Sequence, residues 1–277
     1  MALVQVNFFS ESLLRNVKYL HVIIPNDKRE MDGEGLRPAD KPFKTLYLLH
    51  GIYSGEWDWL TQTRLFKYAK DRNLAVILPC GENGFYNDSP ARHDLYSKFI
   101  GEELVRYTRS LFHLSDKRED TFIGGLSMGG LGAFETAMRY PETFGYVGAL
   151  STATMAQEGF PKEDDPSMYL LSSRTFFETV YGPEATFNGG PNDVYKLADD
   201  LKASGKELPK IFMAIGVDDP LLAGNRRYHE YLEKIGIPVD YSEDKGAHDW
   251  GFWDRNLYRL LDWLPVEQYP KKRVFDF

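Results

Sequence analysis

The chain has 277 residues and a mass of 31.9 kDa, and its composition, 43% hydrophobic and 14% aromatic, excludes an intrinsically disordered protein. A chain of this mass buries roughly three quarters of its surface on folding, and its single cysteine, Cys80, excludes a disulfide-stapled small domain. Its 33 basic and 41 acidic residues give a net charge of −8, which excludes the basic surface typical of nucleic-acid-binding proteins.

The first predicted elements are two edge strands. Residues 4–8 alternate apolar and polar side chains, and the apolar run 18–24 ends at Pro25, so the two predict an antiparallel pair. The charged stretch 26–44 contains several Gly and Pro residues and predicts a surface loop. Five mostly apolar runs follow, as expected for strands covered on both faces, at 45–49, 74–78, 121–123, 146–150 and 211–215.

Helical patterns separate these strands. Apolar residues recur at helical spacing in two sets, Ile100, Leu104, Tyr107 and Leu111, and Tyr228, Tyr231, Leu232 and Ile235. The alternation of strands and helices predicts an α/β fold with a mainly parallel sheet flanked by helices. We expect a single domain over residues 1–277, in which the Gly- and Pro-containing segment 154–208 forms a cap-like excursion above the sheet.

The strongest chemical signal is Gly125-Leu126-Ser127-Met128-Gly129, a G-x-S-x-G motif. It follows the predicted strand 121–123 and precedes a helical stretch that ends before Pro141. A nucleophile elbow has this order, because a tight strand-to-helix turn projects the serine and the glycines leave room around it. The alternative is an ordinary Gly-rich turn between a strand and a helix. The pattern favours Ser127 as a nucleophile.

A nucleophilic serine needs a base, and α/β-hydrolases supply Ser, then Asp or Glu, then His in chain order. Of the six histidines, only His229 and His248 follow Ser127. His229 lies within a predicted helix and is expected to pack or face solvent, whereas His248 lies in a Gly-containing loop before the last helix. The sequence therefore predicts His248 as the base, the alternative being a loop histidine that only packs against that helix.

The acid is expected directly after the strand 211–215, where Asp218 and Asp219 are adjacent. Spacing alone does not separate them, and one of the two is free to cap the next helix. The loop after the strand 45–49 is placed to supply one N–H to an oxyanion from Ile52, and Met128 supplies the other. His50 is expected to shape that loop. The sequence holds neither H-E-x-x-H nor a Cys/His cluster, so we expect no metal and no cofactor.

With these residues in place, the chain resembles the esterase D family of α/β-hydrolases, which includes tributyrin esterases, S-formylglutathione hydrolases and feruloyl or acetylxylan esterases. The segments that carry the resemblance are Leu49-His50-Gly51, Asn83 to Asp88, Gly125 to Gly130, Gly216 to Leu221, and His248 to Trp253. The resemblance implies the α/β-hydrolase fold, with Ser127, Asp219 and His248 as the catalytic triad and Ile52 and Met128 as oxyanion donors. It favours Asp219 because the family places its acid three residues after Gly216, although Pro220 stands where the family usually has an aromatic residue.

The expected function is that of a serine carboxylesterase acting on short acyl esters, with tributyrin esterases as the most similar branch. Three other reactions stay open, namely removal of acetyl or feruloyl groups from carbohydrates, hydrolysis of S-formylglutathione, and acyl transfer to an acceptor other than water. A non-catalytic binding module is the alternative from another class. Apolar residues within 154–190 are expected to line an acyl pocket, unless they pack on the core or at a subunit contact.

The expected partner is a small-molecule ester, with neither nucleic acid nor a membrane involved. No apolar run reaches the roughly 18 residues of a membrane span, and the N-terminus lacks the layout of a signal peptide. Together with the single cysteine, these features favour the cytoplasm. The family resemblance implies a homo-oligomer.

Overall fold

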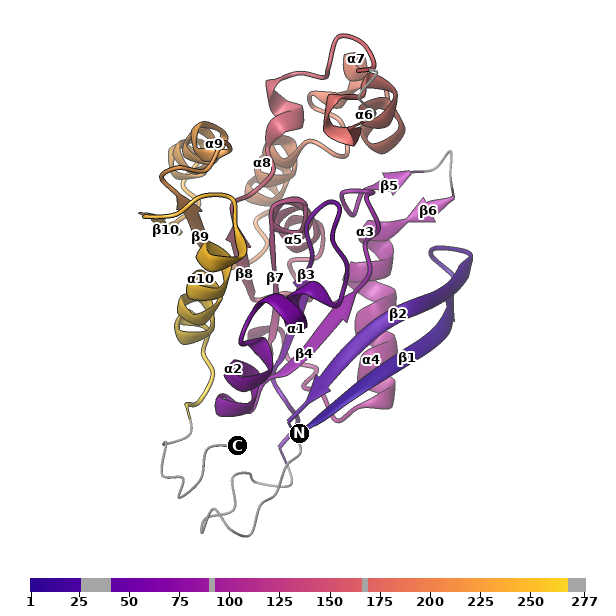
Figure 1. The fold of residues 1–277 in the computed structure, drawn as a ribbon, viewed down its shortest axis with the longest axis vertical. Coiled ribbons are helices and arrows are strands. Elements are labelled where there is room, and N and C mark those ends of the chain that lie inside the picture. Colours follow the sequence, from indigo (N-terminus) through magenta and orange to yellow (C-terminus); the bar gives the residue numbers. More distant parts are fainter. Residues whose placement is uncertain (26–40, 90–92, 166–168, 269–277) are drawn as a thin grey trace.

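A computed structural model describes residues 1–25, 41–89, 93–165 and 169–268 of the chain (Figure 1). Its centre is an eight-stranded sheet in the order β1-β2-β4-β3-β7-β8-β9-β10. The strands are β1 (Ala2–Ser10), β2 (Arg15–Ile24), β3 (Thr45–Leu49), β4 (Ala75–Pro79), β7 (Thr121–Leu126), β8 (Tyr146–Leu150), β9 (Lys210–Gly216) and β10 (Val239–Asp244). A separate two-stranded sheet pairs β5 (Asp88–Ser89) with β6 (Asp94–Leu95).

The sheet is mainly parallel, and its central strands are buried. In the eight-stranded sheet, β1 and β2 pair antiparallel, as do β2 and β4, and the other neighbouring pairs are parallel. All residues of β3, β4 and β7 are buried, whereas β1 alternates between half-buried and exposed side chains because it forms one edge. The predicted mainly parallel sheet is confirmed. Of the predicted loop 26–44, residues 26–40 lie outside the described part of the chain.

Helices cover both faces of the sheet (Figure 1). One face packs against α1 (Asp58–Gln62), α2 (Leu65–Asp71) and α10 (Trp250–Trp263). The other packs against α3 (Tyr96–Lys98), α4 (Leu104–Leu111), α5 (Met128–Arg139), α8 (Val194–Ser204) and α9 (Leu222–Lys234). Among the described helices, none is both long and apolar enough to cross a membrane.

The helix expected through Ile100 and Leu111 departs from a regular α-helix. Its residues Phe99–Glu103 form a π-helical turn between α3 and α4. Within α4, Leu104, Val105 and Thr108 are buried, while its last residue, Leu111, is 50% exposed. The apolar spacing therefore located this helix correctly but placed Leu111 on the wrong face.

The segment between β8 and β9 contains two short 3₁₀ turns, α6 (Arg174–Tyr181), α7 (Glu184–Phe187) and α8. Figure 1 shows α6 and α7 beyond the edge of the main sheet, while α8 returns to pack on α5. An aromatic cluster lies inside this segment, formed by Phe160, Phe177, Tyr181 and Phe187. Its ring centroids lie 5.2 to 6.0 Å apart. The cluster is continuous with the main core, where Phe85 lies 5.4 Å from Tyr181.

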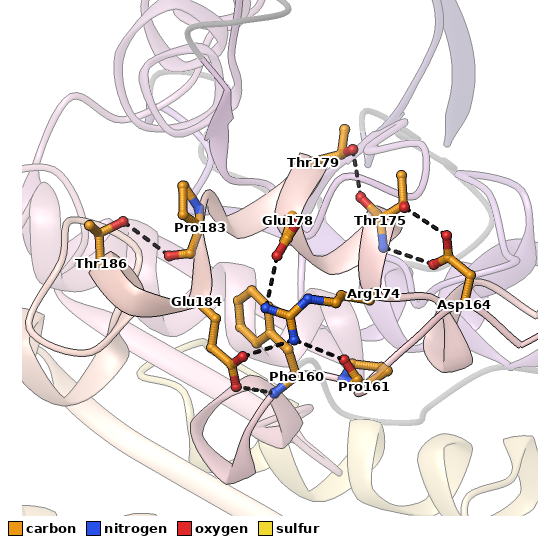
Figure 2. A network of polar contacts seen from close by, with 10 residues as sticks. All are labelled: Phe160, Pro161, Asp164, Arg174, Thr175, Glu178, Thr179, Pro183, Glu184 and Thr186. Carbon is orange, nitrogen blue, oxygen red and sulfur yellow. Dashed lines mark hydrogen bonds and ion pairs between the residues drawn. The ribbon is translucent and has the colours of Figure 1, made fainter.

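A network of polar contacts lies beside that cluster (Figure 2). The Arg174 guanidinium donates to Glu184 (3.0 Å) and to the Pro161 carbonyl (3.2 Å), and it pairs with Glu178 at 2.9 Å. The second carboxylate oxygen of Glu184 accepts from the Phe160 N–H at 3.0 Å. Arg174 therefore ties the start of the segment to both α6 and α7.

Glu135 of α5 carries a buried carboxyl group. Its side chain is fully buried, and neither carboxylate oxygen has a hydrogen-bond partner among the described residues. Arg139, one turn later, lies 3.5 Å away, while burial raises the pKa of Glu135 to about 8 despite this cation. The folded protein therefore holds Glu135 mostly protonated at neutral pH.

The raised pKa of Glu135 predicts a loss of stability as pH rises. Above the usual pKa of a glutamate, the unfolded chain releases this proton while the folded chain keeps it up to about pH 8. Between pH 5 and pH 8 this should cost the parent protein on the order of 3 kcal/mol relative to Glu135→Gln, which has no proton to release. Thermal unfolding of both proteins across that range measures the difference. Unfolding midpoints that change in parallel would contradict the buried-acid account.

Candidate active site

Ser127 lies in the turn between β7 and α5, with backbone angles φ 53° and ψ −118°. This left-handed conformation is unusual for a residue with a side chain and needs support from its surroundings. The support is close packing by two glycines. A Cβ atom on Gly125 would lie 2.4 Å from the Gly129 carbonyl oxygen, and one on Gly129 would lie 2.4 Å from the Leu49 carbonyl oxygen. Both positions therefore require glycine for the turn to form.

His248 lies between Ser127 and Asp219. Its Nε2 is 3.1 Å from the Ser127 Oγ, and its Nδ1 is 2.9 Å from an Asp219 carboxylate oxygen. A carboxylate only accepts hydrogen bonds, so Nδ1 carries the proton and Nε2 is free to accept from the serine hydroxyl. Ser127 and Asp219 are buried, and the His248 side chain is 29% exposed.

Asp219 and Asp218 differ in their surroundings. Asp219 follows β9, and its second oxygen accepts from the Leu221 N–H at 2.8 Å. Burial alone raises the pKa of Asp219, but the hydrogen bonds from His248 and from the Leu221 N–H outweigh it, so the pKa lies below its usual value. Asp218 is exposed, and its backbone N–H donates to the Gly246 carbonyl. The structure thus brings Asp219 to the imidazole and leaves Asp218 in solvent.

The imidazole also packs against a tryptophan that the sequence analysis did not single out. Trp253 of α10 meets His248 edge to face at a centroid distance of 4.9 Å, and its indole N–H donates to the Ser151 hydroxyl at 3.1 Å. Trp250 continues this row of rings, 5.1 Å from Trp253. The His248 to Trp253 segment carried the signal, but its spacing did not say which ring would touch the imidazole.

The loop after β3 runs past Ser127 and is fixed by residues far along the chain. The buried His50 accepts from the Gly81 N–H at 2.8 Å through Nε2, and its carbonyl accepts from the Tyr86 hydroxyl. Tyr53 adopts φ 62°, and its N–H donates to the Asn83 side chain at 2.9 Å. His50 therefore shapes this loop, as the sequence indicated.

Two backbone N–H groups beside Ser127 point to a common role. Neither the Ile52 N–H nor the Met128 N–H donates a hydrogen bond within the described residues. A Cβ atom on Gly51 would lie 3.5 Å from the Ser127 Cβ, so the Ile52 loop lies directly beside the serine. Unpaired N–H groups at such a position are suited to bind an oxyanion.

These groups open into one cavity of about 450 Å³. Its lining combines apolar and aromatic side chains with few polar ones, and consists of Gly51, Ile52, Tyr53, Ser54, Asp58, Leu126, Ser127, Leu171, Pro220, Leu221, His248, Trp250 and Trp253. Sequence reasoning missed Tyr53, Ser54, Asp58 and Trp250 as lining residues.

The segment expected to form an acyl pocket contributes Leu171. Phe176 and Phe177 pack instead on the aromatic cluster, and Tyr169 is 67% exposed. Met168 lies outside the described residues. Within 154–190, Leu171 therefore lines the cavity, whereas Phe176 and Phe177 pack among aromatic rings.

The other histidine that follows Ser127 lies apart from this cavity. His229 stacks on Tyr241 at a centroid distance of 4.1 Å, as expected for a packing residue. Across the described parts of the chain, no group of three or more His, Cys, Asp or Glu side chains is arranged to hold a metal ion.

Comparisons with known proteins fit this geometry. The sequence model of the Esterase family matches residues 28–264. An acetyl esterase of Caldicellulosiruptor saccharolyticus is 39% identical over 95% of this chain and 98% of its own length. Two solved Staphylococcus aureus structures are each 30% identical over 95% of this chain and 98% of their own. They are a substrate-bound fluorophosphonate-binding serine hydrolase (TM-score 0.82) and an S-formylglutathione hydrolase (TM-score 0.80).

Proposed function

The chain belongs to the Esterase family, and we propose that it is a serine carboxylesterase that hydrolyses short-chain acyl esters through an acyl-enzyme. Its fold is that of the α/β-hydrolases, and it is similar to an acetyl esterase and to a serine hydrolase. The observation that carries the proposal is the hydrogen-bonded row Ser127–His248–Asp219 at the wall of a cavity. A serine, an imidazole and a carboxylate in this order form the unit that activates a hydroxyl for acyl transfer.

In the proposed reaction, the Ser127 Oγ attacks the ester carbonyl while His248 Nε2 accepts the hydroxyl proton. The Ile52 and Met128 N–H groups donate to the oxyanion of the tetrahedral intermediate. His248 then gives the proton to the leaving alcohol, and an acyl-enzyme on Ser127 remains. A water molecule attacks that acyl group, gives a proton to His248, and releases the carboxylic acid with the free serine. Asp219 holds the imidazole in its tautomer and stabilises the imidazolium.

The cavity supports a small substrate. Its volume of about 450 Å³ has to hold both the acyl chain and the alcohol, and Leu171 closes part of it. We propose that residues 1–277 form one α/β-hydrolase domain in which 154–208 acts as a cap that reaches the cavity through Leu171. The cytoplasmic location and the homo-oligomer expected from the sequence stay proposals.

The alternatives involve the same machinery. The acetyl esterase relative supports the removal of acetyl groups, and the S-formylglutathione hydrolase supports hydrolysis of a thioester. Removal of feruloyl groups and acyl transfer to another acceptor would use the same acyl-enzyme and differ only in the groups that the cavity admits. A non-catalytic binding module would not require the hydrogen-bonded row Ser127–His248–Asp219.

Ser127→Ala should lower turnover of para-nitrophenyl acetate by up to about a millionfold, because the nucleophile and the base act as a unit. A fluorophosphonate should label the parent protein at Ser127 and leave the variant unlabelled. Circular dichroism of both proteins controls for folding. Substantial activity left in a pure, folded variant would refute the assignment.

Asp219→Asn should lower turnover by about 10⁴-fold, because an amide leaves His248 without a partner for the imidazolium. Asp218→Asn is the matched control, since it makes the same chemical change one residue away on an exposed side chain. It should leave turnover within a few-fold of the parent. If Asp218→Asn is the more damaging variant, the acid has been assigned to the wrong residue.

Leu171→Trp should shift chain-length preference, because a larger ring narrows the cavity. We expect kcat/KM for an octanoyl ester to fall about tenfold relative to the acetyl ester. Tyr169→Ala is the control, since this neighbouring side chain is 67% exposed and does not line the cavity. An unchanged ratio in folded Leu171→Trp would show that residues 154–190 pack without shaping the pocket.

A further inference from the structure

The cavity beside Ser127 contains one acidic side chain, Asp58, and no lysine or arginine of the described chain lines it. Asp58 is the first residue of α1 and reaches the cavity from the loop that follows β3. Its neighbours in the lining are mostly apolar or aromatic, among them Trp250 and Leu171. A substrate that enters the cavity therefore meets a carboxylate that the proposed reaction does not use.

The protein leaves this charge largely unbalanced. One carboxylate oxygen, Oδ2, accepts from the Gly55 N–H at 2.9 Å and from the Ser54 hydroxyl. The other oxygen accepts no hydrogen bond from the described residues, and none of their cationic groups lies within 4 Å of Asp58. Neutral donors hold the carboxylate in place but do not cancel its charge.

The surroundings strengthen the effect of the charge on a substrate. Apolar walls exclude water from part of the cavity, so a charge acts there over a longer distance than in bulk solvent. The net charge of the chain, −8, has the same sign. A substrate carboxylate in the cavity would face Asp58 without a nearby cation to offset the repulsion.

We propose that Asp58 is a specificity-determining residue, which selects neutral or cationic esters and rejects esters that carry a carboxylate close to the reacting carbonyl. The inference rests on the proposed esterase function and narrows its substrate class. It disfavours thioesters of glutathione, whose tripeptide carries more carboxylate than ammonium groups. It favours acyl esters of uncharged alcohols, including those with hydroxyl groups able to donate to the unpaired oxygen of Asp58.

A purely structural role for Asp58 makes a different prediction. If Asp58 only holds the loop through Gly55 and Ser54, its replacement should affect charged and neutral substrates alike. If its charge selects substrates, replacement should change only the ratio between them. Asp58→Asn separates the two, because its amide oxygen still accepts from the Gly55 N–H while the charge is removed.

The experiment compares kcat/KM within two substrate pairs, each matched except for charge. The first pair, para-acetoxybenzoate and its methyl ester, differs in the alcohol, and the second, the hemisuccinate and butyrate of para-nitrophenol, differs in the acyl group. Intrinsic reactivity cancels when each ratio in a variant is divided by that of the parent. In Asp58→Asn, the anionic-to-neutral ratio should rise about tenfold in at least one pair. Added salt should raise the parent's ratio in that pair and reduce the difference between parent and variant.

Two controls accompany this comparison. Asp58→Glu keeps the charge and should keep the parent's ratios, and Asp218→Asn changes the net charge equally on an exposed residue outside the cavity. Ratios that stay unchanged in both pairs for Asp58→Asn, or that rise equally in Asp218→Asn, would overturn the inference. If Asp58→Asn fails to fold, a parent ratio that salt does not move in either pair overturns it as well. Loss of neutral-ester hydrolysis in Ser127→Ala tests the esterase function separately.

Discussion

The turn at Ser127 depends on a close approach between the ends of two neighbouring strands. Ser127 is held at φ 53°, a conformation that costs about 1–3 kcal/mol for a residue with a side chain. Gly129 permits it by letting its backbone pack on the Leu49 carbonyl at the end of β3, too close for any Cβ atom. The same contact brings the loop that follows Leu49 beside the serine, so Ser127 and the Ile52 N–H are positioned together.

The order of the parallel strands then brings Asp219 and His248 close to Ser127. β8 and β9 follow β7 in parallel, and β10 pairs with β9, so the chain leaves every one of these strands at the same edge of the sheet. Asp219 follows β9 and His248 follows β10, which allows side chains 29 residues apart to meet at 2.9 Å. Trp253 of α10 packs against the imidazole of His248 and restricts the orientation of its ring. Each group is held by a different element, and the parallel sheet is what aligns them.

The sequence was sufficient for features that depend on local patterns. Apolar runs located the buried strands, and the motif around Ser127 located the turn, because strand burial and glycine requirements are written into neighbouring residues. The partners of most distant contacts were not predictable, although the sequence indicated that His50 shapes the loop after β3. The loop that carries Asp58 is shaped by hydrogen bonds of His50 to Gly81 and of Tyr53 to Asn83, about 30 residues away. Aromatic residues such as Phe177 are equally suited to a core and to a pocket wall, so composition alone did not distinguish these roles.

The difference between features set by local sequence and features set by distant contacts has a physical consequence for substrate specificity. The proposed reacting groups follow strand ends, where the packing of the sheet leaves little freedom. Other residues that line the cavity lie on the loop after β3, on α10 and on the excursion that carries Leu171. The excursion is stabilised by its aromatic cluster, which joins the main core through Phe85, and by the contacts of Arg174 (Figure 2). Substitutions there can alter the shape and charge of the cavity while the turn at Ser127 stays intact, so that one catalytic arrangement is compatible with different substrates.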